Sequence, residues 1–114
     1  MADYRALIVW QKSMDLVVKL YELTREFPQE EQYALTSQMR RAVVSIPSNI
    51  SEGSRRRGKD QKYFLVIAYG SASELETQLE ISRRLRYGKE PIRKQVEALL
   101  VEVLRMLNKM TSGY

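Results

Sequence analysis

The chain has 114 residues, of which 44% are apolar and 29% charged, and its formal net charge at pH 7 is +5. These fractions are typical of a folded globular domain and exclude disordered and fibrous classes. The sequence contains neither cysteine nor histidine, which excludes disulfides, thiolate nucleophiles, the usual zinc ligands and the most common general base near neutral pH.

We therefore expect one domain over residues 1–114 that binds rather than catalyses, with no cofactor and no metal. The N-terminal stretch shows neither an uninterrupted apolar segment nor a cleavage site of small residues. The uncharged run at residues 42–51 contains Pro47 and Asn49 and is shorter than the roughly 20 apolar residues that span a bilayer. These features predict a cytoplasmic protein without a membrane partner.

The first periodic segment runs from Val9 to Phe27. Its apolar residues recur every three or four positions on two adjacent helical stripes. One stripe holds Trp10, Met14, Val17 and Tyr21, and the other holds Val9, Leu16, Leu20, Leu23 and Phe27. Such a broad apolar surface contacts more than one neighbour, and Pro28 ends the helix because the residue before proline leaves the α region.

The second segment, Leu35 to Glu52, is predicted to be a helix capped by Thr36 or Ser37. Its apolar face consists of Leu35, Met39, Ala42, Val43, Ile46 and Ile50. Pro47 removes one backbone hydrogen bond at a cost of about 3 kcal/mol unless something compensates. We predict a helix that is kinked at Pro47 and stopped by Gly53, with Ser48, Asn49 or Ser51 near the disturbed turn. A break into two short helices is the alternative.

The last two segments are helices predicted over residues 60–87 and 91–110. The third has the stripe Phe64, Ile67, Ala68, Ser71, Leu75, Leu79, Ser82 and Leu85, with small residues around Gly70 that another backbone can approach. Gly88 is predicted to stop it, and Pro91 to occupy the first turn of the next helix. The fourth has Ile92, Val96, Leu99, Val103, Met106 and Met110 in heptad spacing, with Leu100, Leu104 and Leu107 beside them.

Four such helices with short connections predict an all-α, antiparallel, up-down-up-down four-helix bundle. A single core uses one stripe per helix, so the doubled stripes of the first and last helices leave apolar surface over. That surplus indicates an oligomer.

The positive charge is concentrated at two turns. Residues 53–62 hold five basic residues and one acidic residue, and residues 83–94 hold six and one. In the bundle these turns lie at opposite ends. The first supplies the candidate nucleic-acid-binding residues, because adjacent arginines on a glycine-flanked turn can bind several phosphates: Arg55, Arg56, Arg57, Lys59 and Lys62.

Two other interpretations of these charged turns stay open. Charge runs at helix ends are often ordinary solvated surface, and Tyr63 could either stack on a base or belong to the core. The second turn is expected to be offset by Glu26, Glu30 and Glu31.

Further patterns favour structural explanations. Glu76 and Glu80 share a helix face, but without histidine or more carboxylates they predict ion pairs, Glu80 with Arg84 and Glu76 with Arg83, rather than a metal or acid–base site. No phosphate-binding glycine motif occurs, and the polar residues around Pro47 are expected to satisfy backbone groups.

Several ordered motifs resemble one known family. They include Trp10-Gln11-Lys12, Phe27-Pro28, the run Leu35-Thr36-Ser37-Gln38-Met39-Arg40-Arg41-Ala42, the run from Ser45 to Gly53, and Glu74-Leu75-Glu76. Over about Leu7 to Tyr87 the chain is similar to bacterial four-helix-bundle proteins associated with intervening sequences of large-subunit (23S) ribosomal RNA genes. The chain has Ser51 where that family more often has alanine.

This resemblance implies a four-helix bundle that assembles as a homopentamer, and a relation to the accessory proteins of diversity-generating retroelements, which bind nucleic acid and a reverse transcriptase. It implies no catalytic residues. Two functions are therefore predicted as alternatives. One is an oligomer that binds structured RNA through the arginine turn, and the other is an adaptor that docks a protein partner such as a reverse transcriptase through apolar helix faces.

Overall fold

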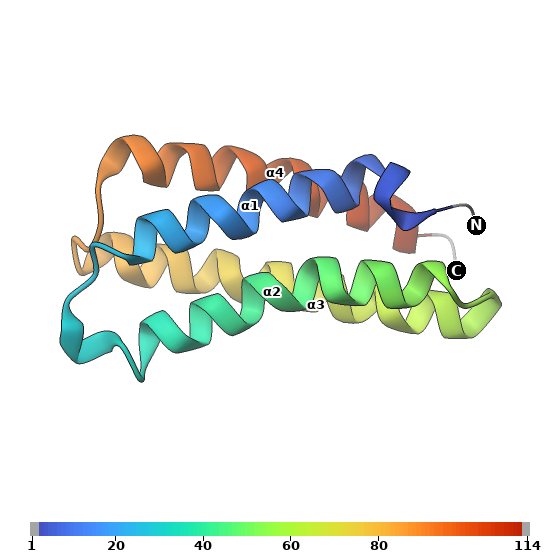
Figure 1. The fold of residues 1–114 in the computed structure, drawn as a ribbon, viewed down its shortest axis with the longest axis horizontal. Helices are drawn as coiled ribbons and strands as arrows, with labels where there is room; N and C mark the ends of the chain where they lie inside the picture. Colours follow the sequence, from blue (N-terminus) through green and yellow to red (C-terminus); the bar gives the residue numbers. More distant parts are fainter. Residues whose placement is uncertain (1–2, 113–114) are drawn as a thin grey trace.

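The computed structural model describes residues 3–112, which form four α-helices and two short 3-10 helices. Their order is η1 (Tyr4–Ala6), α1 (Ile8–Thr24), η2 (Gln29–Glu31), α2 (Leu35–Ser54), α3 (Gly58–Arg84) and α4 (Glu90–Thr111). Helix α1 packs against α2 and α4, and α3 packs against the same two helices (Figure 1). The predicted all-α, up-down-up-down bundle is therefore confirmed.

Helix α2 runs without a break through Pro47, which is buried. The alternative of two short helices is wrong. As predicted, polar side chains lie near the turn that contains Pro47. The side-chain amide nitrogen of Asn49 donates to the backbone oxygen of Ser45 at 2.8 Å, and the Ser51 hydroxyl donates to that of Ser48 at 3.0 Å. The Ser45 and Ser71 hydroxyl oxygens lie 2.8 Å apart, so the same turn is tied to α3.

Two helix ends near the first connection differ from the prediction. Helix α1 ends at Thr24, because the Phe27 amide turns back to the backbone oxygen of Thr24 at 3.0 Å in a tighter hydrogen-bonding pattern. Neither Thr36 nor Ser37 caps α2. Helix α2 follows Ala34, whose side chain cannot cap, and the Leu35 amide donates to Oε1 of Glu31 at 3.3 Å.

Helix α3 ends at Arg84, before the predicted stop at Gly88. The Tyr87 amide donates to the backbone oxygen of Ser82 at 3.0 Å and the Arg86 amide to that of Arg83 at 3.0 Å, which is the Schellman pattern of a helix terminus. Arg86 takes the left-handed position of this motif with φ 61°, and Gly88 follows with φ 82°. Pro91 lies in the first turn of α4, as predicted.

The buried residues confirm some of the predicted core faces, whereas in other helices a different side faces the core. The predicted Leu16 stripe of α1 and the Met39 stripe of α2 are buried almost throughout. In α3, Leu65 and Ala72 are buried although they were not predicted, whereas the predicted Leu85 is 49% exposed. In α4 the buried apolar residues combine both predicted stripes: Val96, Leu100, Val103 and Leu107.

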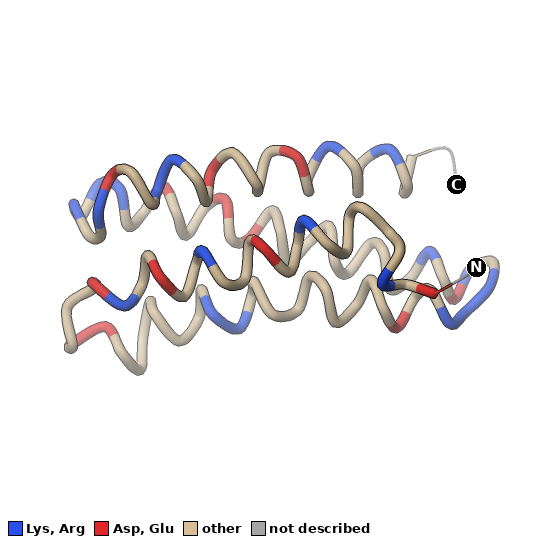
Figure 2. Tube along the Cα trace, turned by 45° about the horizontal axis from the view of Figure 1, so that its top comes forward, with Lys and Arg blue, Asp and Glu red and all other residues tan. Residues whose placement is uncertain are grey.

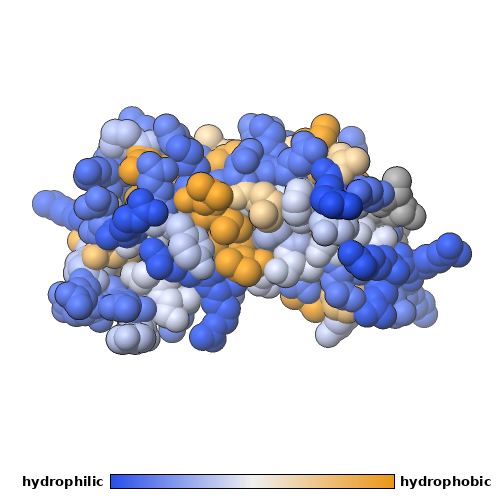
Figure 3. Space-filling view, in the orientation of Figure 1, coloured by the Kyte–Doolittle hydropathy of each residue, from blue (hydrophilic) through white to orange (hydrophobic). Residues whose placement is uncertain are grey.

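Much of the predicted surplus apolar surface is covered inside the bundle. Trp10, Val17, Leu99 and Met106 are half-buried against the core. Some apolar side chains remain exposed, among them Ile8, Met14, Val18, Val44, Val66, Ile81, Leu85 and Val101. Figure 3 shows apolar surface gathered at the middle of the α1/α2 face, between more hydrophilic ends.

Gly70 lies on the exposed face of α3, with nothing within 4 Å of the position where a Cβ would stand. We expect Gly70→Ala to raise the free energy of unfolding by about 0.5–1 kcal/mol, because glycine destabilises a helix interior by that amount relative to alanine. Urea denaturation at low protein concentration measures it. If a second chain packs closely on Gly70, as the small residues predict, the substitution will instead weaken assembly at high concentration.

Candidate nucleic-acid interface

The turn between α2 and α3 is short and firmly held. Arg55 caps the end of α2, and Arg57 stands at the start of α3 in an extended conformation. The side-chain amide nitrogen of Gln61 donates to the backbone oxygens of Gly53 and Arg56, each at 3.2 Å. A Cβ at Gly53 would come within 3.2 Å of Phe64 Cβ, so glycine lets the two helices approach closely where the turn begins.

The five predicted binding residues have different surroundings. The Arg55 guanidinium lies over the Tyr4 ring, 5.5 Å from its centroid. The Arg56 guanidinium pairs with Glu52 at 2.6 Å, and its carbon lies 5.4 Å from the Phe64 ring centroid. Arg57 and Lys59 are exposed and form no ion pair within residues 3–112. Lys62, on the first turns of α3, is half-buried.

The turn therefore offers fewer free guanidinium groups than the sequence predicted. Arg56 is partly neutralised by its own chain through the pair with Glu52. Exposed ion pairs of this kind contribute only about 0.2–1 kcal/mol. A phosphate can therefore compete for Arg56 at little cost in stability.

Other segments bring more charge to the same end of the bundle. Figure 2 shows the C-terminal end of α4 and the N-terminal end of the described chain on the same side as the α2–α3 turn. Arg105 and Lys109, in the C-terminal part of α4, are exposed, while Arg5 is paired with Asp3 at 2.9 Å. Counting charge by sequence segment missed Arg105 and Lys109, although the up-down-up-down topology itself places both chain ends at the end of the bundle that holds the α2–α3 turn.

Tyr63 is 62% exposed and packs edge-on against Phe64, with ring centroids 5.2 Å apart. The core interpretation of Tyr63 is therefore wrong. An exposed ring beside a basic turn is available to stack on a base.

Part of the positive charge at the opposite end of the bundle is paired with carboxylates. Glu80 contacts Arg83 at 2.6 Å and Arg84 at 2.8 Å, and hydrogen bonds from these two guanidinium groups lower the pKa of the Glu80 carboxyl to about 2. The Lys89 ammonium lies 3.9 Å from Glu26. The predicted pair of Glu80 with Arg84 is confirmed. The predicted pair of Glu76 with Arg83 is wrong, because Glu80 is nearer to Arg83 along the helix.

Arg93, predicted to belong to this second basic cluster, is only 1% exposed. Its Nη1 donates to the backbone oxygen of Leu79 at 3.0 Å and to the Ser82 hydroxyl at 2.9 Å, and its Nη2 donates to the backbone oxygen of Tyr87. Its Nε lies 3.4 Å from Glu90 without making a hydrogen bond. Arg93 thus fastens the end of α3 to α4 and is not available to a ligand.

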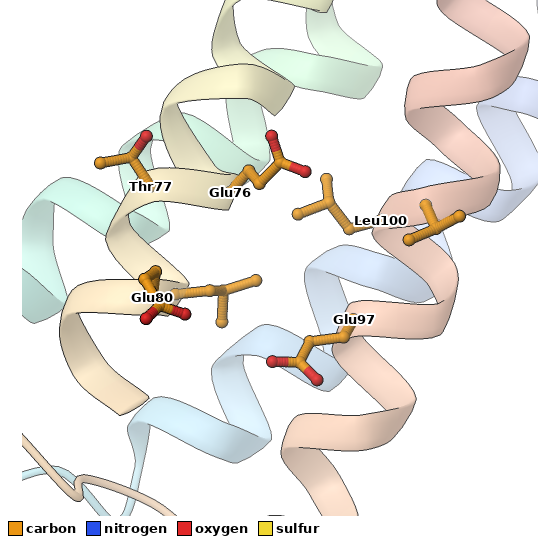
Figure 4. Close-up of a pocket in the computed structure, with 7 residues that line it drawn as sticks. Glu76, Thr77, Glu80, Glu97 and Leu100 are labelled. Atoms are coloured by element: carbon orange, nitrogen blue, oxygen red, sulfur yellow. The ribbon is translucent and has the colours of Figure 1, made fainter. Parts of the chain in front are cut away.

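Glu76 and Glu80 lie along a groove of about 570 Å³ between α3 and α4. In Figure 4, Glu76 and Glu97 extend toward the groove from opposite walls, with Leu100 between them. Within residues 3–112, no three acidic side chains come together in a way that could hold a metal ion. In the same part of the chain, no helix is long and apolar enough to cross a membrane.

The fold and the charge distribution define the class of protein: a small four-helix bundle with exposed arginine and lysine residues at both ends. The chain matches the family model described as 23S rRNA-intervening sequence protein over residues 5–109. It belongs to that family.

Among solved structures, the chain is similar to a protein of unknown function from the S23 ribosomal protein family of Bacteroides thetaiotaomicron. The two share 23% sequence identity with a TM-score of 0.80, over 92% of this chain and 99% of that chain. At this identity the likeness shows the fold alone. A comparison with curated proteins finds no significant match.

Proposed function

We propose that the protein is a non-enzymatic, oligomeric, nucleic-acid-binding protein that contacts structured RNA with the basic end of its bundle. The observation that carries this proposal is the exposure of Arg57 and Lys59 without a carboxylate partner within residues 3–112. The exposed Lys109, in the last turn of α4, lies at the same end of the bundle (Figure 2). The family description names 23S rRNA intervening sequences and no ligand, so RNA as the ligand rests on the chemistry of this end.

The chemistry of this end suits backbone contacts. Guanidinium and ammonium groups bind phosphate oxygens, and such contacts carry no sequence information by themselves. The ring of Tyr63 adds a stacking surface for an unpaired base. We therefore expect recognition by shape and charge, with affinity that falls steeply as salt rises.

Oligomerisation would multiply this surface. The resemblance implies a homopentamer, and in a cyclic assembly each copy would present its own basic end, so that several phosphates are bound at once. The relation to retroelement accessory proteins remains part of the same proposal. Light scattering of the purified protein measures the oligomer size.

Replacing Arg55, Arg56 and Arg57 together by alanine is expected to weaken RNA binding by more than about tenfold and to reduce the slope of affinity against salt, because phosphate contacts are lost. Binding of a structured RNA at several salt concentrations measures both. The matched control replaces Arg83, Arg84 and Arg86 by alanine, which removes the same charge from the opposite end. Equal losses in the two variants, or binding that does not depend on salt, would refute the proposal.

The α3–α4 groove favours a second candidate function, docking of a protein partner. Leu79 and Leu100 line its floor, while Val101 beside them is 49% exposed. Contacts with such an apolar surface persist at high salt, whereas phosphate contacts fail. A partner retained after a high-salt wash and lost in Val101→Asp would support the adaptor function instead.

A further inference from the structure

A second site lies away from the arginine turn. A groove of about 510 Å³ runs between the C-terminal half of α1 and the N-terminal half of α2. It adjoins a hollow of about 270 Å³, and both are lined by Gln32, Thr36 and Arg40. The bundle is 42 Å long, and this groove is near the opposite end from the proposed RNA interface (Figure 1).

Arg40 lines both hollows and is held by contacts with α1. Its Nε donates to the Thr24 hydroxyl at 2.9 Å, its Nη2 to the backbone oxygen of Tyr21 at 3.4 Å, and its guanidinium lies 4.3 Å from the centroid of the Tyr21 ring. All of these partners are neutral. Arg40 is half-buried, and no carboxylate within residues 3–112 pairs with it.

A half-buried cation without a counter-charge favours an anion. The guanidinium has lost part of its hydration, and an ion pair is stronger in such surroundings than in water. The stacking on Tyr21 and the bond to Thr24 fix its orientation before any ligand arrives, which lowers the entropy that binding costs. These contacts leave Nη1 free of any hydrogen bond within the described residues.

Thr36 gives a second, independent indication. The residue is 7% exposed and lines both hollows, and its hydroxyl makes no hydrogen bond within residues 3–112. It stands in the first turn of α2, whose dipole attracts negative charge and whose preceding residue, Ala34, provides no cap. The hydroxyl of a largely buried residue that lines a cavity at such a helix start is suited to donate to a phosphate oxygen.

The nearest carboxylate at this helix start is already occupied. Oε1 of Glu31 accepts from the Leu35 amide at 3.3 Å, and its Oε2 accepts from the Tyr87 hydroxyl at 2.9 Å. Glu31 does not line the groove, whereas a second arginine, Arg41, does. The charged groups that line the groove are therefore both cationic.

Tyr33 adds an aromatic surface to the same groove. It is 90% exposed, which is unusual for so large a side chain and gives its ring no packing role in the bundle. We propose that the α1–α2 groove binds a nucleoside phosphate, either free or at the end of a nucleic-acid strand. Arg40, Arg41 and Thr36 hold the phosphate, and Tyr33 stacks on the base.

Titration of the full-length, 15N-labelled protein with AMP tests this site. We expect the amide signals of Thr36, Ser37, Arg40 and Arg41 to shift. Arg40→Gln should weaken AMP binding by about tenfold or more, because a hydrogen-bonded charge pair is lost. Tyr33→Ala should weaken AMP severalfold and leave inorganic phosphate unaffected. Arg41→Gln, at an exposed position, is the second phosphate variant should Arg40→Gln fail to fold.

Controls separate this site from the proposed RNA interface. Arg84→Gln removes one arginine from outside the groove and should leave AMP binding unchanged, as should the triple substitution at Arg55, Arg56 and Arg57. An oligonucleotide with and without a 5′-phosphate distinguishes a strand end from a free nucleotide, and shifts in the groove with either phosphorylated probe support the site. The site is refuted if AMP and inorganic phosphate leave the amide signals of the groove unmoved. It is also refuted if adenosine binds as well as AMP, or if Arg84→Gln weakens AMP binding as much as Arg40→Gln does.

Discussion

Gly88→Ala is expected to lower the free energy of unfolding by about 2–5 kcal/mol, because two penalties act together. Gly88 has φ 82°, a conformation that residues with a Cβ rarely adopt, and its added Cβ would stand 2.6 Å from Leu23 Cδ1 and 3.1 Å from Phe27 Cε1. Leu23 is fully buried and has little room to move. Urea denaturation followed by circular dichroism measures the loss.

Gly58 is the matched control for Gly88. It also has a positive φ, 56°, but nothing lies within 4 Å of its Cβ position. Gly58→Ala should therefore cost only the backbone penalty, about 1–2 kcal/mol. If the two substitutions lower the free energy of unfolding equally, the close approach of the α3–α4 connection to α1 adds no measurable penalty at Gly88.

Arg93→Met is expected to destabilise the protein by about 2–6 kcal/mol, because each of two buried acceptors that loses its donor costs about 1–3 kcal/mol. The substitution keeps much of the apolar volume, but it leaves the backbone oxygens of Leu79 and Tyr87 without the donors that Arg93 provides. Thermal and urea denaturation of the variant measure the change.

Two further variants identify the cause of that loss. Arg93→Lys retains the charge but lacks the forked geometry that reaches both backbone oxygens, so an intermediate loss is expected. Lys94→Met, at the exposed neighbouring position, should change stability by no more than about 0.5 kcal/mol. A loss below about 1 kcal/mol in Arg93→Met would mean that water replaces the arginine.

The sequence predicted the helices and their order because apolar periodicity reports helical faces directly. It predicted the core face well in α2, where one stripe is clearly dominant, and in α1 one of the two predicted stripes is the buried one. It was less accurate in α3 and α4. Several residues near Gly70 are small, and α4 has two apolar stripes, so periodicity alone did not fix which side of either helix faces the core.

The role of Arg93 could not be read from the sequence. Its partners are mainly backbone oxygens of α3 and the following turn, and a pattern of charged letters does not show them. It therefore looked like one member of an exposed basic run. The stop at Arg86 was missed for a related reason, because an arginine in the left-handed region has no distinctive sequence signal.

The arginine turn was located correctly from the sequence, but the pairing of Arg56 with Glu52 was not predicted. Glu52 precedes Arg56 by four residues, a spacing that indicates an ion pair on one helix face, and this signal was available in the sequence. Arg40, by contrast, lies in a helical segment whose sequence carries no binding motif. Its importance depends on Tyr21 and Thr24 of α1, which only the folded structure brings beside it.

The placement of both ends of the described chain has a practical consequence. Residues 3 and 112 lie at the same end of the bundle as the arginine turn (Figure 1). An affinity tag or a fluorescent fusion attached at either terminus would emerge beside the basic surface and obstruct it. The connection from Gln29 to Ala34, at the far end, is the better place to attach a label for experiments on RNA, whereas Tyr33 there must stay unmodified for experiments on nucleotides.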